Sequence, residues 1–305
     1  MKQVGLMKGI TAPLLTPFQR DGQVDYAGYT RLASYVTRSG AHGVFVGGTT
    51  GEFVNLTLRE RMGLLEAAQR GLEKEARVMC NITAMNLEDL RLLANHARES
   101  GVDAVSVTAP YYHRYDARAL RDYFCQIAEL AEGLPLYLYN IPGMTGNPIP
   151  PAVLGEVLQR CPNVVGLKDS SMDLMTLLEY QCAAEGCGLV LLTGNDAQVL
   201  TALQSGADGG VIAMAGIFPA LCRRIWEGFW ANNLEEARTA QKTVLKLREL
   251  ARRVMPVMGH KAMMEELGFP MGAARFPMRE LTESERRTIR IGLKELGLLP
   301  EKREE

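Results

Sequence analysis

The sequence has no long hydrophobic segment and almost no net charge. No apolar run reaches the roughly 20 residues that a membrane-spanning helix requires, so we expect no membrane association. Residues 1–10 lack the apolar stretch of a signal peptide, so we expect no export. The formal net charge of -1 gives no basic excess that would indicate nucleic-acid binding. These absences predict a cytoplasmic protein that acts on small molecules.

Motifs for disulfides, metals and nucleotides are also missing. The 6 cysteines form no C-x-x-C and several lie in apolar runs, so we expect reduced core thiols. None of the 4 histidines has metal-ligand spacing to another, and there is no H-E-x-x-H, so we expect no metal site. No Walker loop and no G-x-S-x-G serine motif occurs. We therefore expect chemistry that uses side chains alone, without a cofactor.

A regular alternation of short apolar runs and amphipathic segments fills most of the chain. Eight such units follow one another, with predicted strands at residues 9–15, 43–47, 77–83, 104–109, 136–140, 164–168, 189–193 and 210–213. Regular alternation indicates a parallel sheet, and eight units indicate its closure into a (β/α)8 TIM barrel. An open doubly wound sheet is the alternative, less favoured because no G-x-G-x-x-G follows the first strand.

The pattern changes after residue 231. Residues 234–253, 261–267 and 282–296 are predicted to be helical, with no strand between them. We predict a barrel over residues 1–231 and a C-terminal helical extension over residues 232–305, packed as one unit.

One predicted strand ends in a lysine. Apolar or small residues at 164–167 lead directly into Lys168 and Asp169, as in a strand buried on both faces. Lys168 would then lie where the barrel wall ends, and a partly desolvated amine there can attack a carbonyl carbon. No other lysine has a comparable place; Lys261, for example, is predicted to open a helix. The alternative is a structural lysine paired with a carboxylate such as Asp169.

Polar residues follow the other predicted strands. The turn Gly48-Thr49-Thr50-Gly51 would expose consecutive backbone N–H groups and two hydroxyls, which suit a small carboxylate. Tyr139, at another strand end, could pack or could relay protons. In a (β/α)8 barrel all these positions share the C-terminal end of the strands, where active sites form.

Five segments of the sequence, in this order, resemble the dihydrodipicolinate synthase/N-acetylneuraminate lyase family. They are Gly48-Thr49-Thr50-Gly51-Glu52, Pro110-Tyr111-Tyr112, Tyr139-Asn140-Ile141-Pro142 with Thr145-Gly146, Gly166-Leu167-Lys168-Asp169-Ser170, and Gly206-Ala207-Asp208-Gly209. The resemblance covers essentially the whole chain. It implies a class I aldolase mechanism, in which a lysine forms a Schiff base with pyruvate or another 2-oxo acid, and an aldehyde is the second substrate.

The resemblance also implies roles for individual residues. Lys168 would form the imine and Tyr139 would transfer protons, while Gly48, Thr49 and Thr50 would hold the carboxylate of the 2-oxo acid. Gly194 and Ile212 would line the pyruvate pocket. Tyr112 would reach across a tight dimer into the active site of the neighbouring subunit. A homotetramer built from two such dimers is implied.

One position departs from the family pattern. Synthases of this family carry an arginine after the Y-N-x-P motif for the carboxylate of aspartate semialdehyde, and here Met144 occupies that place. Asn195 and Asp196 instead suit hydroxyl groups. We therefore predict a lyase for a 2-keto-3-deoxy sugar acid or a related hydroxy-oxo acid. The alternatives are dihydrodipicolinate synthase itself, and a family member that binds 2-oxo acids without turnover.

Overall fold

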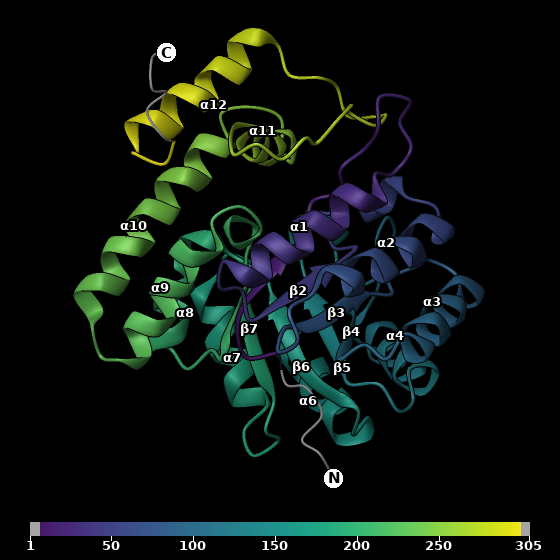
Figure 1. Ribbon diagram of the computed structural model, residues 1–305. Coiled ribbons are helices and arrows are strands. Elements are labelled where there is room, and N and C mark those ends of the chain that lie inside the picture. The colour runs from purple at the N-terminus through teal and green to yellow at the C-terminus, as the bar shows by residue number, and fades with distance from the viewer. Residues whose placement is uncertain (1–6, 300–305) are drawn as a thin grey trace, which may run out of the picture.

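Eight parallel strands pair in chain order and close into a barrel in the computed structural model, which describes residues 7–299. The strands are β1 Gly9–Pro13, β2 Gly43–Val46, β3 Arg77–Asn81, β4 Ala104–Thr108, β5 Leu136–Asn140, β6 Val164–Asp169, β7 Val190–Thr193 and β8 Gly209–Val211. β1 pairs with both β2 and β8, so the sheet has no free edge (Figure 1). The predicted (β/α)8 TIM barrel is confirmed.

Helices between the strands cover the outside of the barrel. They are α1 Tyr26–Arg38, α2 Leu58–Gly71, α3 Leu87–Glu99, α4 Ala117–Leu130, α6 Pro151–Arg160, α7 Leu174–Ala183, α8 Val199–Gln204 and α9 Pro219–Trp230. Asp25 caps α1, and Thr57 forms a capping box with Glu60 at the start of α2. Three short helical turns were not predicted, η1 Phe53–Asn55, α5 Pro142–Thr145 and η3 Ala213–Gly216, and a fourth, η2 Asp196–Gln198, was not distinguished from the helix that follows it.

Several predicted strand ends are wrong by one or two residues. The strand predicted over 77–83 ends at Asn81, because the Asn81 side chain accepts hydrogen bonds from the backbone N–H and hydroxyl of Thr83. These bonds turn the chain out of the sheet. The strand predicted over 164–168 continues to Asp169, which still pairs with Asn140 of β5.

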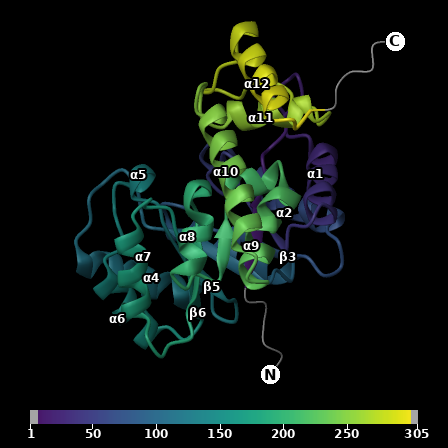
Figure 2. The ribbon, with the colours of Figure 1, turned by 90° about the vertical axis from the view of Figure 1, so that its left-hand side faces the viewer.

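Three helices form the predicted C-terminal extension: α10 Leu234–Ala251, α11 Met258–Glu266 and α12 Glu283–Glu295. Figures 1 and 2 show α10 beside α9, with α11 and α12 packed together beyond its end. The prediction that Lys261 opens a helix is wrong. Lys261 lies inside α11, which begins at Met258, and its side chain is buried. Residues 1–6 and 300–305, the outer ends of the two predicted regions, lie outside the described residues.

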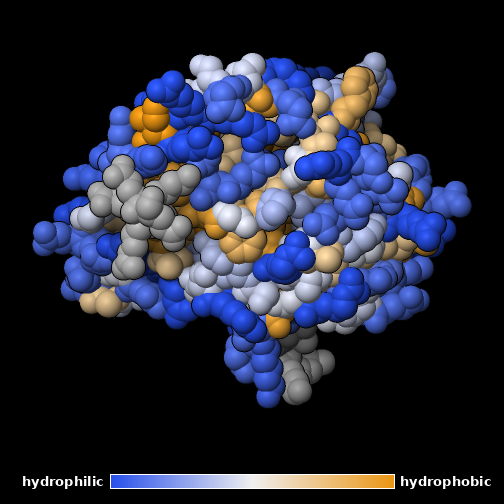
Figure 3. Space-filling model, turned by 45° about the horizontal axis from the view of Figure 1, so that its top comes forward, coloured by the Kyte–Doolittle hydropathy of each residue, from blue (hydrophilic) through white to orange (hydrophobic). Residues whose placement is uncertain are grey.

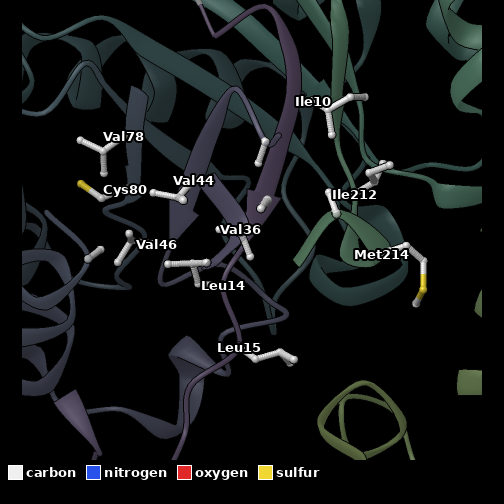
Figure 4. Close-up of a cluster of buried hydrophobic side chains, with 14 of the residues drawn as sticks. Ile10, Leu14, Leu15, Val36, Val44, Val46, Val78, Cys80, Ile212 and Met214 are labelled. Atoms are coloured by element: carbon white, nitrogen blue, oxygen red, sulfur yellow. The ribbon is translucent and has the colours of Figure 1, made fainter. Parts of the chain in front are cut away.

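Alternate residues of each strand face two separate cores. In β2, Val44 and Val46 pack against the surrounding helices, and Phe45 points into the barrel. Figure 4 shows part of the outer core, where aliphatic side chains of β1, β2, β3, α1 and the β8–η3 segment lie close together. Fully burying one such side chain stabilises the fold by about 1.5–3 kcal/mol. Both cores therefore contribute to the stability of the barrel.

Tyr137 closes the barrel interior below the level of Tyr139. A Cβ atom at Gly166 would lie 2.0 Å from the Tyr137 ring, so the ring fills the space over that glycine. The Tyr137 hydroxyl accepts a hydrogen bond of 2.9 Å from the backbone N–H of Met7, which precedes β1. The barrel is thus filled at its N-terminal end, and chemistry is confined to the other end.

The thiols and the surface complete the description. Cys80, Cys161 and Cys222 are buried as expected, but Cys182 and Cys187 are exposed, so the expectation of core thiols holds only in part. The molecular face in Figure 3 is mostly hydrophilic, with apolar residues in small patches. Among residues 7–299, no helix is long and apolar enough to cross a membrane.

Candidate active site

Lys168 lies near the end of β6 with its side chain inside the barrel and only 4% exposed. Its Nζ atom is 3.8 Å from the centre of the Tyr139 ring and 4.9 Å from that of Phe45. Within residues 7–299, no carboxylate lies at ion-pair distance from this amine. The surroundings are therefore aromatic and largely dry, and the amine faces the open end of the barrel.

The alternative pairing of Lys168 with Asp169 is contradicted. Asp169 points to the outer side of β6, where its carboxylate accepts hydrogen bonds from the Asn140 amide at 2.7 Å and the Ser171 hydroxyl at 2.7 Å. Burial raises the pKa of Asp169, and these hydrogen bonds oppose the rise. Asp169 therefore joins the ends of β5 and β6 and leaves the lysine unpaired.

Tyr139 stands beside Lys168 because the two residues are register partners on β5 and β6. The phenol is 3% exposed, and its oxygen lies 3.4 Å from the Thr49 hydroxyl. Burial alone would raise its pKa, but the charge of Lys168 and hydrogen bonds with Thr49, Lys168 and Ser170 outweigh burial and lower the pKa. A phenol with a lowered pKa beside an amine is suited to moving protons.

The turn after β2 leaves two backbone donors free. Gly51 N–H donates to the Gly48 carbonyl and Glu52 N–H to that of Thr49, both at 3.0 Å. In the part of the chain that the structure describes, no protein group accepts from the N–H groups of Thr49 and Thr50. Consecutive free N–H groups form an anion-binding concavity, as expected for a carboxylate site.

Gly194 follows β7 and touches the lysine. A Cβ atom there would lie 1.9 Å from Ser170 Oγ and 2.9 Å from Lys168 Cε, so only glycine fits. Ile212 is fully buried, and its side chain packs in the outer core (Figure 4). A contact between Ile212 and a bound 2-oxo acid would therefore fall to its backbone.

Asn195 and Asp196 each serve a backbone amide. Asn195 Oδ1 accepts a hydrogen bond from Ala197 N–H at 3.1 Å, and Asp196 Oδ1 accepts one from Met214 N–H at 2.8 Å. Burial raises the pKa of Asp196 to about 6, opposed mainly by that hydrogen bond and by the charge of Arg248. One oxygen of each side chain is therefore already bound to the backbone.

Met144 lies in α5 at the mouth of the barrel and is 69% exposed. It borders a cavity of about 180 Å³ that reaches Thr49, and no charged side chain lines it; the lining residues are Thr49, Phe53, Val54, Thr108, Tyr111, Ile141, Met144 and Thr145. A neutral substrate group matches such a wall better than an anionic one.

Tyr112 lies apart from these residues. Its ring is 90% exposed, and its backbone has a positive φ of 80°. The Asn147 side chain fixes this loop by donating to the carbonyls of Pro110 at 2.8 Å and His113 at 2.7 Å. A ring so exposed takes no part in the buried site of its own subunit.

Two residues close to the site, Glu52 and Lys261, form a buried ion pair that the sequence did not reveal. The Glu52 carboxylate lies 2.6 Å from Lys261 Nζ, and the two side chains are 1% and 2% exposed. Glu52 ends the recognised Gly48–Glu52 motif, which was the only available signal. Lys261 comes from α11, and no local pattern indicated its burial.

The site has an amine, a phenol, two hydroxyls and free backbone donors. Among residues 7–299, no group of three or more His, Cys, Asp or Glu side chains could hold a metal ion. A buried amine beside a proton-transferring phenol can form an imine with a carbonyl compound.

Comparison with known proteins agrees with this chemistry. Residues 6–296 match the model of the dihydrodipicolinate synthetase family. A 4-hydroxy-tetrahydrodipicolinate synthase of Thermus thermophilus is 31% identical over 299 residues, which cover 98% of this chain and 99% of that protein. An uncharacterised DapA-like lyase of Pyrococcus horikoshii is 32% identical over 247 residues, 80% of this chain and 84% of that protein.

A solved structure extends the comparison to three dimensions. The crystal structure of YagE, a prophage protein of the dihydrodipicolinic acid synthase family from E. coli K12 in complex with pyruvate, superposes with a TM-score of 0.91 at 26% identity, covering 96% of this chain and 100% of that one. With a family match over nearly its whole length, the chain belongs to the dihydrodipicolinate synthetase family and is a lyase of the class I aldolase type.

Proposed function

We propose that the protein makes or breaks a carbon–carbon bond through a Schiff base between Lys168 and pyruvate or another 2-oxo acid. The observation that supports this most directly is the buried Lys168 amine, which lies 3.8 Å from the centre of the Tyr139 ring and has no carboxylate partner among residues 7–299. A protonated imine withdraws electrons from the substrate, and neither a metal nor a coenzyme is needed.

The reaction would begin with the formation of the imine. Lys168 Nζ attacks the C2 carbonyl, and the resulting carbinolamine loses its hydroxyl as water with a proton from Tyr139. In the cleavage direction, the C3–C4 electron pair moves into the iminium and the aldehyde leaves, with the proton of its C4 hydroxyl taken by the Tyr139 phenolate that the dehydration left. The enamine then gains a proton at C3, and water releases the 2-oxo acid. The free N–H groups of Thr49 and Thr50 would bind the C1 carboxylate, and the Thr49 hydroxyl would pass protons to and from Tyr139.

We propose a neutral aldehyde partner, as in a 2-keto-3-deoxy sugar acid or a related hydroxy-oxo acid. The uncharged cavity beside Met144 supports a neutral group. Support from Asn195 and Asp196 is weaker than the sequence suggested, because one oxygen of each side chain is bound to the backbone.

Dihydrodipicolinate synthase activity is the second candidate, favoured by the name of the Thermus thermophilus relative. A charge-assisted hydrogen bond contributes roughly 1.5–3 kcal/mol, so Met144→Arg should raise condensation with aspartate semialdehyde by one to two decades. If the unmodified enzyme already prefers aspartate semialdehyde to every neutral aldehyde, the second candidate replaces the first.

We further propose a homotetramer of two tight dimers, in which the partner subunit's Tyr112 completes each site. The exposure of Tyr112 supports this, because residues 7–299 of its own subunit leave it 90% exposed.

Borohydride trapping tests the proposal. Incubation with pyruvate and borohydride should add one pyruvyl group per chain, and Lys168→Ala should abolish the adduct. Lys8→Ala is the matched control, because Lys8 is a half-exposed lysine paired with Asp208 beside the opposite end of the barrel. An undiminished adduct in Lys168→Ala would refute the role of Lys168. An adduct with no turnover of any aldehyde in a panel would favour a binding protein.

A further inference from the structure

The ion pair of Glu52 and Lys261 connects the site to the C-terminal helices. Among the ion pairs of residues 7–299, it is the one in which both side chains are nearly inaccessible, at 1% and 2%. Lys261 Nζ also lies 4.4 Å from the centre of the Phe18 ring, which gives the cation an aromatic face. Burial lowers the pKa of Lys261 and the Glu52 carboxylate opposes that shift, so the charge of Lys261 depends on Glu52.

Such a pair is weak evidence for stability alone. Removing two charges from water carries a large desolvation penalty, and well-packed apolar residues of similar volume stabilise a fold equally well or better. A buried pair can instead fix one arrangement of the chain. The question is which arrangement Glu52 fixes.

Glu52 closes the turn that holds the free N–H groups. Its backbone is left-handed, with a φ of 59° and a ψ of 34°, which is unfavourable for a residue other than glycine. Its N–H donates to the Thr49 carbonyl at 3.0 Å and its carbonyl accepts from Asn55 at 2.8 Å. A movement of Glu52 would therefore change the direction of the Thr49 and Thr50 N–H groups.

The other end of the pair is also held firmly. The segment after α11 is bound to the loops of the barrel mouth: Met271 accepts a backbone hydrogen bond from Phe18 at 3.0 Å. The Arg275 guanidinium donates to both oxygens of Glu60, at 2.7 Å and 3.0 Å, and to the Asn55 carbonyl. These hydrogen bonds hold α11, and with it Lys261, against the barrel next to Glu52.

We propose that Lys261 is a positioning residue: through Glu52 it holds the Thr49–Thr50 turn in the shape that binds the carboxylate of the 2-oxo acid. The inference rests on the proposed role of that turn. It assigns the C-terminal helices a part in substrate recognition.

The test uses a double variant that carries both Glu52→Gln and Lys261→Met. This variant is compared with the wild type. Both replacements keep the side-chain volume and leave no lone buried charge, so the double variant should fold where either single variant might not. Glu266→Gln is the matched control, because it breaks an exposed ion pair of the same helix with Arg290.

The first measurement is imine trapping with pyruvate and with methyl pyruvate, which lacks the anionic carboxylate. We expect the preference for pyruvate over the ester to fall by roughly tenfold or more in the double variant, the worth of a charge-assisted hydrogen bond. Glu266→Gln should keep the wild-type preference. An equal loss of both adducts would mean a general defect and would overturn the inference, as would an unchanged preference. A wild type that traps neither compound refutes the proposed function as well.

Hydrogen exchange provides a measurement that needs no substrate. Amides of the peptide covering residues 47–53 should exchange faster in the double variant than in the wild type or in Glu266→Gln, because the turn would open more often. Equal exchange in all three proteins would show that the pair does not hold the turn.

Discussion

Lys168 and Asp169 are neighbours in the chain, yet they point to opposite sides of β6. Side chains alternate along a strand, so a lysine facing the barrel interior is followed by a residue facing the helices. This is why the nearest carboxylate in the sequence pairs with Asn140 and not with the amine. The position of Lys168 was predictable from its strand end, but the direction of each side chain required the register of β6 against β5.

Gly194 should tolerate no side chain. In Gly194→Ala the new methyl group would push Ser170 and the Lys168 side chain aside, since the Cβ atom would lie 1.9 Å and 2.9 Å from their atoms. A displacement of about 1 Å can lower a rate by about a hundredfold, so we expect a loss of that order in kcat/KM. Gly143→Ala is the control, because a Cβ atom at Gly143 meets nothing within 4 Å. Steady-state kinetics that show equal effects for both variants would contradict this expectation.

Tyr139→Phe should keep the fold and lower kcat by roughly 10²–10⁴-fold, the usual contribution of a positioned acid or base. Tyr137→Phe is a strict comparison on the same strand and the same inward face. It leaves the Met7 N–H without its acceptor and should cost about 1–3 kcal/mol of stability with little change in rate. Kinetics and thermal unfolding of both variants would separate the roles. An unchanged rate for Tyr139→Phe would reduce the phenol to packing.

At the scale of elements, the alternation of strands and helices was readable because each strand is an apolar run of its own. The short turn α5 was missed, and η2 was not distinguished from the helix that follows it, since four or three residues carry no periodicity. These turns hold Met144 and Asp196, so both errors matter for the site. The sequence suggested hydroxyl binding by Asn195 and Asp196 but not their structural roles. Asn195 caps η2, and Asp196 joins η2 to η3.

Asp196 joins η2 to η3 and should make stability depend on pH. Burial raises its pKa from 3.8 to about 6, so the folded protein holds this proton more tightly than the unfolded chain. The resulting stabilisation is complete below the unfolded value and is lost as the pH rises through about 6. Its full extent is at most roughly 3 kcal/mol.

Asp196→Asn keeps an acceptor for Met214 N–H and removes the titration. The stability of the variant relative to the wild type should therefore increase as the pH rises from about 4 to about 8. Thermal unfolding of both proteins at the two pH values measures this difference. A constant difference between them would show that the Asp196 carboxyl has a similar pKa in both states.

At the scale of the molecule, the sequence predicted a C-terminal helical extension but not its connection with the barrel. Lys261 and Arg275 reach the barrel loops through contacts with residues far away in sequence. A charged residue in a helix normally indicates a solvated face, and no local pattern identifies the rare buried exception. The pairing with Glu52 became visible only once the chain was folded.

Intersubunit complementation tests the place of Tyr112. Tyr112→Ala and Lys168→Ala should each be nearly inactive alone. In a dimer of one subunit of each kind, one of the two sites would combine an intact Lys168 with the partner subunit's Tyr112. Random mixing would then restore about a quarter of the wild-type activity, because half of the dimers are mixed and each has one complete site. If the mixture, after subunit exchange, remains as inactive as its components, Tyr112 acts within its own subunit or not at all.

The Glu52–Lys261 pair also bears on how the protein is made. A ribosome delivers Glu52 about 200 residues before Lys261, at roughly 5–20 residues per second. Throughout that interval Lys261 is not yet available to this carboxylate, so the pair cannot hold the turn after β2. We expect the turn to reach its final shape only after the last helices emerge. A chain that ends at residue 231 would then contain Lys168 but not Lys261, and the turn that binds the carboxylate would lack its ion pair.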